Sequence, residues 1–148
     1  MADLEVVVAG GGNAALCAAI TAREKGAAVT LFESAPENMR GGNTRHTRNL
    51  RASHAEPLET LEDSYTEDEF WDDILKVTHG NTDENLTKLM IRQSPLLLSW
   101  LKARDVRFQP ALSGTLSLHR TNAFFLGGGK TLLNKLYSHA EKIGVSVL

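Results

Sequence analysis

The sequence predicts an α/β fold in which an incomplete parallel sheet is interrupted by a mainly helical insertion. Leu4–Val8 is a short, valine-rich run typical of a buried strand, and it leads through glycines into an Ala- and Leu-rich helical stretch over 13–25. Gly26 stands where that helix would end, and Ala28–Phe32 is a second apolar strand. Strand, helix and strand in this order predict a βαβ unit, whose two strands are parallel.

The turn between the first strand and the helix reads Gly10-x-Gly12-x-x-Ala15, which is the dinucleotide-binding fingerprint of the Rossmann fold. Gly10 permits the tight turn, Gly12 lets a pyrophosphate approach the backbone, and the small Ala15 lets the helix pack closely on the sheet. Glu33 ends the second strand, close to the spacing of about 20 residues expected of an acid that binds a ribose. The unpaired first N–H groups of the helix suit a diphosphate, so we predict a nucleotide site here.

Composition excludes several other classes of function. The chain has 148 residues, about one domain, and a net charge of -2 that gives no reason to expect nucleic-acid binding. The single cysteine, Cys17, allows no disulfide framework and favours a reducing compartment, so we expect a cytoplasmic protein. The opening residues do not read as a signal peptide, and no apolar run approaches the length of a membrane span.

A second glycine-rich loop follows the second strand. It reads Gly41-Gly42-Asn43-Thr44, and four arginines with no acid between them lie from Arg40 to Arg51. One interpretation is a solvated basic loop. We favour contact with a ligand, because ligands of open α/β sheets bind at the carboxyl ends of the strands.

Together, the fingerprint, the glutamate that ends the second strand and the GGNT loop resemble the flavoprotein subunits of the fumarate reductase/succinate dehydrogenase family. The longer string GGNTRHTRNLR, residues 41–51, is similar to the tricarballylate dehydrogenase branch of that family. It is also similar to the flavoprotein half of CobZ-type precorrin-3B synthases.

The resemblance implies that the cofactor is FAD. Thr44 falls where members with covalently attached flavin carry a histidine, so we expect non-covalent FAD, with His46 as the alternative attachment point. His-Thr-Arg-Asn, residues 46–49, stands where many members carry a small-residue run beneath the flavin ring. This suggests that arginines line this edge of the site and favours a small polycarboxylate substrate, with Arg48 and His119 as weaker substrate contacts. The resemblance implies that the catalytic acid–base lies beyond residue 148, and no metal site is expected. The residues that it implies for FAD are Gly10, Gly12, Asn13, Ala14, Ala15, Glu33, Ser34, Gly42, Asn43, Thr44 and Arg45.

The function expected from this resemblance is oxidation of a polycarboxylate such as tricarballylate to an unsaturated product. In that reaction the flavin takes a hydride from one carbon while a base removes a proton from its neighbour. One alternative is the flavoprotein part of a precorrin-3B synthase. Another is an NAD-binding module without chemistry of its own, against which the GGNT loop argues.

Relatives continue past the last strand of this sequence, so we expect the chain to be the amino-terminal part of a longer enzyme and inactive alone. For that enzyme the resemblance implies a membrane or iron–sulfur protein as electron acceptor. We expect residues 1–54 and 127–148 to belong to the FAD-binding domain, and residues 55–126 to form the insertion.

Within the insertion, Thr66-x-x-Glu69 is a capping box that predicts a helix through about Val77. A second helix is predicted to begin at 81–83, and Ser94-Pro95 to end it and start a third helix over 96–104. The remaining predicted elements are strands at Val106–Phe108 and Thr115–Leu118, a helix after Gly127–Gly129 that ends at Gly144, and a strand at Val145–Leu148.

Overall fold

The computed structural model describes residues 4–111 and 118–148. The chain forms two compact units: a first unit of Met1–Arg48 with Gly127–Leu148, and a second unit of Asn49–Leu126. We predicted that the FAD-binding domain ends at residue 54 and resumes at residue 127. That division into domains stays a prediction.

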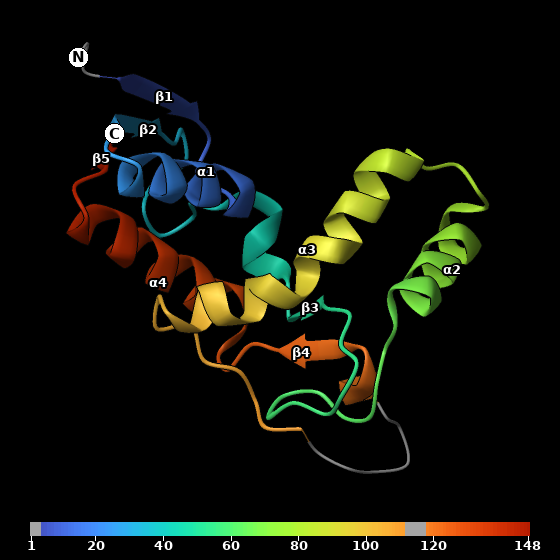
Figure 1. Ribbon diagram of the computed structural model, residues 1–148. Coiled ribbons are helices and arrows are strands. Elements are labelled where there is room, and N and C mark those ends of the chain that lie inside the picture. Colours follow the sequence, from blue (N-terminus) through green and yellow to red (C-terminus); the bar gives the residue numbers. More distant parts are fainter. Residues whose placement is uncertain (1–3, 112–117) are drawn as a thin grey trace. The chain divides into compact units, whose positions relative to one another are not determined.

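The first unit is the predicted βαβ unit extended by one more helix and strand (Figure 1). Its three strands are parallel and lie in the order β1-β2-β5, with Val7 beside Thr30 and Thr30 beside Ser146. This arrangement confirms the predicted α/β class. The elements are β1 (Glu5–Ala9), α1 (Asn13–Glu24), β2 (Ala28–Phe32), the 3-10 helix η1 (Gly42–His46), α4 (Gly128–Lys142) and β5 (Ser146–Val147).

Both long helices of this unit lie on the same side of the sheet (Figure 1). On the covered face the side chains of Val29 and Leu31 are buried, as are apolar residues of α1 and α4 such as Ile20 and Leu136. The opposite face is open, and Val7 on it is 64% exposed. Within the described residues β1 pairs only with β2, so its outer edge is free and the sheet is incomplete.

The second unit contains two longer helices and a two-stranded antiparallel sheet. Helix α2 begins at the predicted capping box: the Thr66 hydroxyl accepts from the Glu69 N–H at 3.2 Å, and the Glu69 carboxylate accepts from the Thr66 N–H at 2.9 Å. No helix in the described part of the chain is both long and apolar enough to cross a membrane. The elements are β3 (Asn49–Arg51), α2 (Glu67–Thr78), α3 (Glu84–Lys102), the 3-10 helix η2 (Leu118–Arg120) and β4 (Asn122–Phe124).

The predicted break at Ser94-Pro95 is wrong, because α3 runs through Pro95 without interruption. Proline has no N–H, so the carbonyl of Ile91, four residues earlier, loses its helical donor. Two hydroxyls replace that donor: the Ser94 hydroxyl donates to the Ile91 oxygen at 2.7 Å, and the Ser53 hydroxyl at 3.2 Å. Ser94 therefore supports the helix from inside and does not cap a new one.

The short strands of the second unit were also mispredicted. Val106–Phe108 is not a strand, since only Phe108 forms an isolated bridge, with Phe125. Most of the strand predicted at Thr115–Leu118 lies outside the described residues, and Leu118 begins η2. The strands that do form, β3 and β4, join segments far apart in the sequence, and neither was predicted.

Candidate functional site

The turn between β1 and α1 has the geometry that its glycines predict. Gly10 has a φ of 95°, a conformation that side chains disfavour, and its N–H donates to the carbonyl of Phe32 at 2.7 Å. Gly12 is the N-cap of α1 and, as a glycine, makes no side-chain hydrogen bond to cap that end. The first N–H groups of α1 therefore lie in a glycine-lined turn, which is the arrangement that binds phosphate groups.

The GGNT loop meets this turn directly. The Thr44 hydroxyl accepts a hydrogen bond from the Asn13 N–H at 3.1 Å. A Cβ on Gly12 would lie 3.6 Å from the carbonyl oxygen of Gly41 and 3.7 Å from the Thr44 hydroxyl. The two glycine motifs, predicted separately, thus lie against each other.

Helix α4 supports the loop from behind. Its Gly129 N–H donates to the carbonyl of Thr47 at 2.8 Å, and a Cβ on Gly129 would overlap the carbonyl oxygen of Thr44. Glycine at position 129 therefore allows the helix to approach η1 closely. This contact gives the Gly127–Gly129 run a structural role that the sequence did not reveal.

Glu33 presents an ionised carboxylate beside the turn. One of its oxygens accepts from the Ala35 N–H at 2.9 Å, and the other accepts from the Gly41 N–H at 3.2 Å. These backbone hydrogen bonds, that from Ala35 foremost, lower the pKa of the carboxyl although partial burial opposes them. A carboxylate oxygen has more than one acceptor direction, so Glu33 can also accept from ribose hydroxyls.

Tyr137 is a residue of this region that was not predicted from the sequence. This residue lies on the buried face of α4, and its hydroxyl donates to the carbonyl of Gly11 at 2.9 Å. The guanidinium of Arg40 stacks on its ring, with 3.7 Å between the guanidinium carbon and the ring centroid. The available signal was spacing, because Tyr137 follows Leu133 by four residues on the same helix face.

The other predicted site residues differ in their exposure and in the unit to which they belong. Arg45 donates to the carbonyl of Arg40 at 3.4 Å, and Arg48 is exposed. His119 belongs to the second unit, where it is only 9% exposed and its ring lies 5.0 Å from that of Phe124. Ala15 is half-buried, whereas the exposed members of the set predicted for FAD are Gly10, Ala14, Ser34, Gly42 and Asn43.

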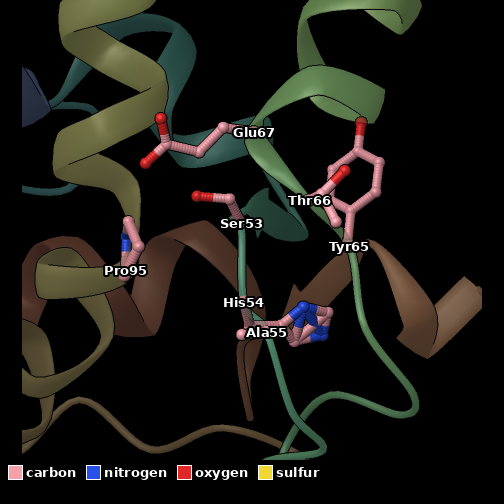
Figure 2. Close-up of a pocket in the computed structure, with 7 residues that line it drawn as sticks. All are labelled: Ser53, His54, Ala55, Tyr65, Thr66, Glu67 and Pro95. Atoms are coloured by element: carbon pink, nitrogen blue, oxygen red, sulfur yellow. The ribbon is translucent and has the colours of Figure 1, made fainter.

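The second unit has a cavity of about 250 Å³ of its own (Figure 2). In this view the side chains of Ser53, Glu67 and Pro95 lie on one side of the segment 53–55, and the His54 ring lies on its other side. Burial, followed by the positive charge of Arg120, lowers the pKa of His54. None of the residues predicted for FAD lines this cavity, and the described residues contain no cluster of three side chains suited to a metal.

Comparison with known proteins identifies the class of the site. The model of the FAD binding domain family matches residues 5–143. The chain belongs to this family. The family binds FAD, which confirms the predicted cofactor and argues against the alternative of an NAD-binding module.

Individual relatives span the same region. The chain is 29% identical over 150 residues to the NADH:fumarate oxidoreductase of Klebsiella pneumoniae (strain 342). The aligned region covers 97% of this chain and 16% of that protein. The sequence thus spans about a sixth of that relative.

Two solved structures share the fold. The 3-ketosteroid-Δ4-(5α)-dehydrogenase of Rhodococcus jostii RHA1, in complex with 4-androstene-3,17-dione, superposes with a TM-score of 0.76 at 21% identity, over 99% of this chain and 38% of that one. Sdh1 of Mycobacterium smegmatis, in complex with UQ1, gives 0.66 at 17% identity, over 95% of this chain and 23% of that one.

Proposed function

We propose that this chain is the FAD-binding portion of a flavin-dependent oxidoreductase of the fumarate reductase type. The observation that supports this most strongly is the meeting of the two glycine motifs at Asn13 and Thr44, beside the ionised Glu33. In this proposal residues 1–54 and 127–148 contribute to the cofactor domain, and residues 55–126 form an insertion in it.

The residues present fit an FAD. The Asn13 N–H at the start of α1 already donates to Thr44, so the neighbouring N–H groups of Gly12 and Ala14 are the ones offered to a diphosphate. Glu33 offers acceptors to the adenosine ribose. When bound, FAD supplies the transfer of a hydride to or from the substrate carbon. The part of this chain is to hold the ADP half of the cofactor and to exclude a 2′-phosphorylated nucleotide, which the Glu33 charge repels.

The FAD is held non-covalently in this proposal. Thr44 occupies the position that a flavin-linking histidine takes in related proteins, and its hydroxyl is engaged by the Asn13 N–H. Acid precipitation of FAD-loaded protein should release yellow flavin into the supernatant. Flavin retained in the precipitate would contradict this, and His46, an exposed histidine in η1, would be the first residue to substitute.

The substrate that we propose is a small polycarboxylate such as tricarballylate. Arg48 is exposed immediately after η1, where a carboxylate could reach it, and an arginine binds a carboxylate through two parallel hydrogen bonds. His119, buried against Phe124, is a weaker candidate. A precorrin substrate is the alternative from the CobZ resemblance. Assays of the longer enzyme with tricarballylate and with a precorrin would separate the two.

The electron acceptor of the longer enzyme is also part of the proposal. We propose a membrane or iron–sulfur partner protein, in keeping with the family that the GGNTRHTRNLR string resembles. Measuring reoxidation of the reduced flavin in the longer enzyme with a quinone and with an oxidised iron–sulfur protein would test it. Reoxidation by neither would remove this part of the proposal and leave the FAD site unaffected.

The Glu33 carboxylate gives the most direct test of the nucleotide site. Glu33→Ala should weaken FAD binding by about 1.5–3 kcal/mol, the range for a hydrogen bond to a charged group. Glu37→Ala is the matched control, because that carboxylate lies in the same loop and its side chain is 86% exposed. Equal FAD affinity in both variants, measured by flavin fluorescence, would overturn the assignment of Glu33.

The 148-residue chain should bind the ADP half of FAD and leave the isoalloxazine side open. Its affinity for FAD should therefore be much weaker than that of the longer enzyme, and it should not reduce a dye with tricarballylate. Robust turnover by these residues would contradict the proposal that the catalytic acid–base lies elsewhere. In that case Arg45, His46 and Arg48 would be the candidates.

A further inference from the structure

The buried hydroxyl of Tyr137 is aimed at the centre of the nucleotide turn. Tyr137 is completely buried on α4, and its hydroxyl lies 2.9 Å from the carbonyl oxygen of Gly11. Burial raises the pKa of this phenol, and the Glu33 carboxylate raises it further. The hydroxyl therefore keeps its proton at neutral pH and acts as a donor.

The hydrogen bond fixes the orientation of one particular peptide group. The carbonyl of Gly11 and the N–H of Gly12 belong to the same planar unit, and the described chain has no cis peptide bond. In a trans peptide these two groups point in opposite directions. Holding the Gly11 oxygen toward α4 therefore turns the Gly12 N–H away from α4, toward the open end of α1.

The surroundings hold the phenol ring in place. The Arg40 guanidinium covers the ring at 3.7 Å and lies 3.8 Å from the Glu141 carboxylate and 3.9 Å from that of Glu37. A Cβ on Gly11 would overlap the Tyr137 hydroxyl and would lie 2.7 Å from a Glu33 carboxylate oxygen. The middle glycine of the turn, a variable position in the fingerprint, is thus required here by Tyr137 and Glu33.

We propose that Tyr137 is a positioning residue for the diphosphate of the bound nucleotide. Its hydroxyl sets the Gly11–Gly12 peptide so that the Gly12 N–H faces the diphosphate before the nucleotide arrives. Preorganisation of this kind raises affinity because the donor does not have to be ordered on binding. The inference rests on the proposed nucleotide site at Gly10–Ala15.

Tyr137→Phe tests the proposal, because it removes one oxygen atom and keeps the ring beneath Arg40. NMR titration of the full chain with ADP should show about two- to tenfold weaker binding, the effect of one hydrogen bond. Binding of adenosine, which has no diphosphate, should be unchanged. A merely structural role would weaken ADP and adenosine by the same factor.

Tyr65→Phe is the matched control. Tyr65 is also buried, and its hydroxyl donates to the Asp73 carboxylate at 2.8 Å in the second unit. This variant should lose thermal stability and bind ADP as the wild type does. Wild-type ADP affinity in Tyr137→Phe, or equal losses for ADP and adenosine, would overturn the proposal.

A measurement on the unmodified chain covers the case in which Tyr137→Phe does not fold. The Gly12 amide resonance should shift strongly with ADP and little with adenosine, and an unresponsive Gly12 amide would overturn the positioning role. Absence of any ADP binding by the wild type would instead overturn the nucleotide site itself. If the wild type binds ADP and Tyr137→Phe binds it equally well, the nucleotide site stands and only the positioning role of Tyr137 fails. The two failures can therefore be told apart.

Discussion

The Thr44 hydroxyl accepts a hydrogen bond from the Asn13 N–H at 3.1 Å, across 31 residues of sequence. This contact joins the turn after β1 to the loop after β2. It also satisfies one of the N–H groups that the start of α1 leaves without an intrahelical partner. The next N–H groups of α1, those of Ala14 and Ala15, also lack an intrahelical acceptor and can donate to a ligand.

The contact can be tested with two substitutions of Thr44. Thr44→Val keeps the shape and removes the acceptor, so it should lower the free energy of unfolding by about 0.5–1.5 kcal/mol. Thr44→Ser keeps the hydroxyl and should lose less. Urea denaturation would measure both, and a valine variant as stable as the serine variant would show that the hydrogen bond contributes nothing.

Gly11 and Gly12 should respond differently to alanine. At Gly12 an added Cβ meets no atom closer than 3.6 Å, so Gly12→Ala should fold and then hinder the close approach of the diphosphate. At Gly11 the Cβ would overlap the Tyr137 hydroxyl, so Gly11→Ala should destabilise the first unit itself. Melting temperatures and ADP titrations distinguish the two effects. A Gly12→Ala variant that binds ADP normally would contradict the fingerprint assignment.

Because the Ser94 and Ser53 hydroxyls compensate for Pro95, we expect the effects of substituting Ser94 and Pro95 on stability to depend on each other. Ser94→Ala should destabilise the chain by about 0.5–1.5 kcal/mol, because it removes the shorter of the two hydrogen bonds to the Ile91 carbonyl. In a Pro95→Ala background the restored N–H bonds to that carbonyl, so the same serine substitution should cost less. Urea denaturation of the four proteins gives the coupling, and additive effects would argue against the compensation.

The open face of the sheet should promote self-association. Parallel sheets are ordinarily covered on both faces, whereas Val7 here is 64% exposed and Phe32 47% exposed on the same uncovered face. Val7→Lys should therefore shift the chain toward monomer in sedimentation experiments. Val77→Lys is the control, since Val77 is 77% exposed on α2 of the other unit. Equal association of both variants with the wild type would place the contact elsewhere.

His54 should make stability depend on pH. Burial and the positive charge of Arg120 lower its pKa below the ordinary 6.5, and the Asp63 charge opposes the shift. The unfolded chain therefore takes up a proton as the pH falls through 6.5 while the folded chain resists it, and stability decreases until the folded pKa is reached. His54→Gln should lose less stability than the wild type between about pH 7.5 and pH 5.5. An identical loss in both would exclude His54 as the cause.

Much of the first unit could be predicted because its signals are local. The apolar runs, the spacing Gly10-x-Gly12-x-x-Ala15 and the terminal Glu33 are read within single elements, and β2 was predicted at its observed bounds. The capping box at Thr66 is local in the same way. Assigning each of them required only residues a few positions apart in the sequence.

What the sequence alone determined is therefore the βαβ unit and its glycine-rich turn, since hydrophobic periodicity and glycine spacing act over short distances. The FAD class came from the resemblance of the sequence motifs to a flavoprotein family. The tertiary structure decided the rest through contacts that join distant segments. The strands β3 and β4 exist only as partners of each other, and the hydroxyl of Ser53 helps α3 continue through Pro95. Tyr137 appeared to be an ordinary helix residue until folding placed its hydroxyl on Gly11, 126 residues away. Local preference cannot encode such a contact, because its free energy depends on two segments that meet only in the folded chain.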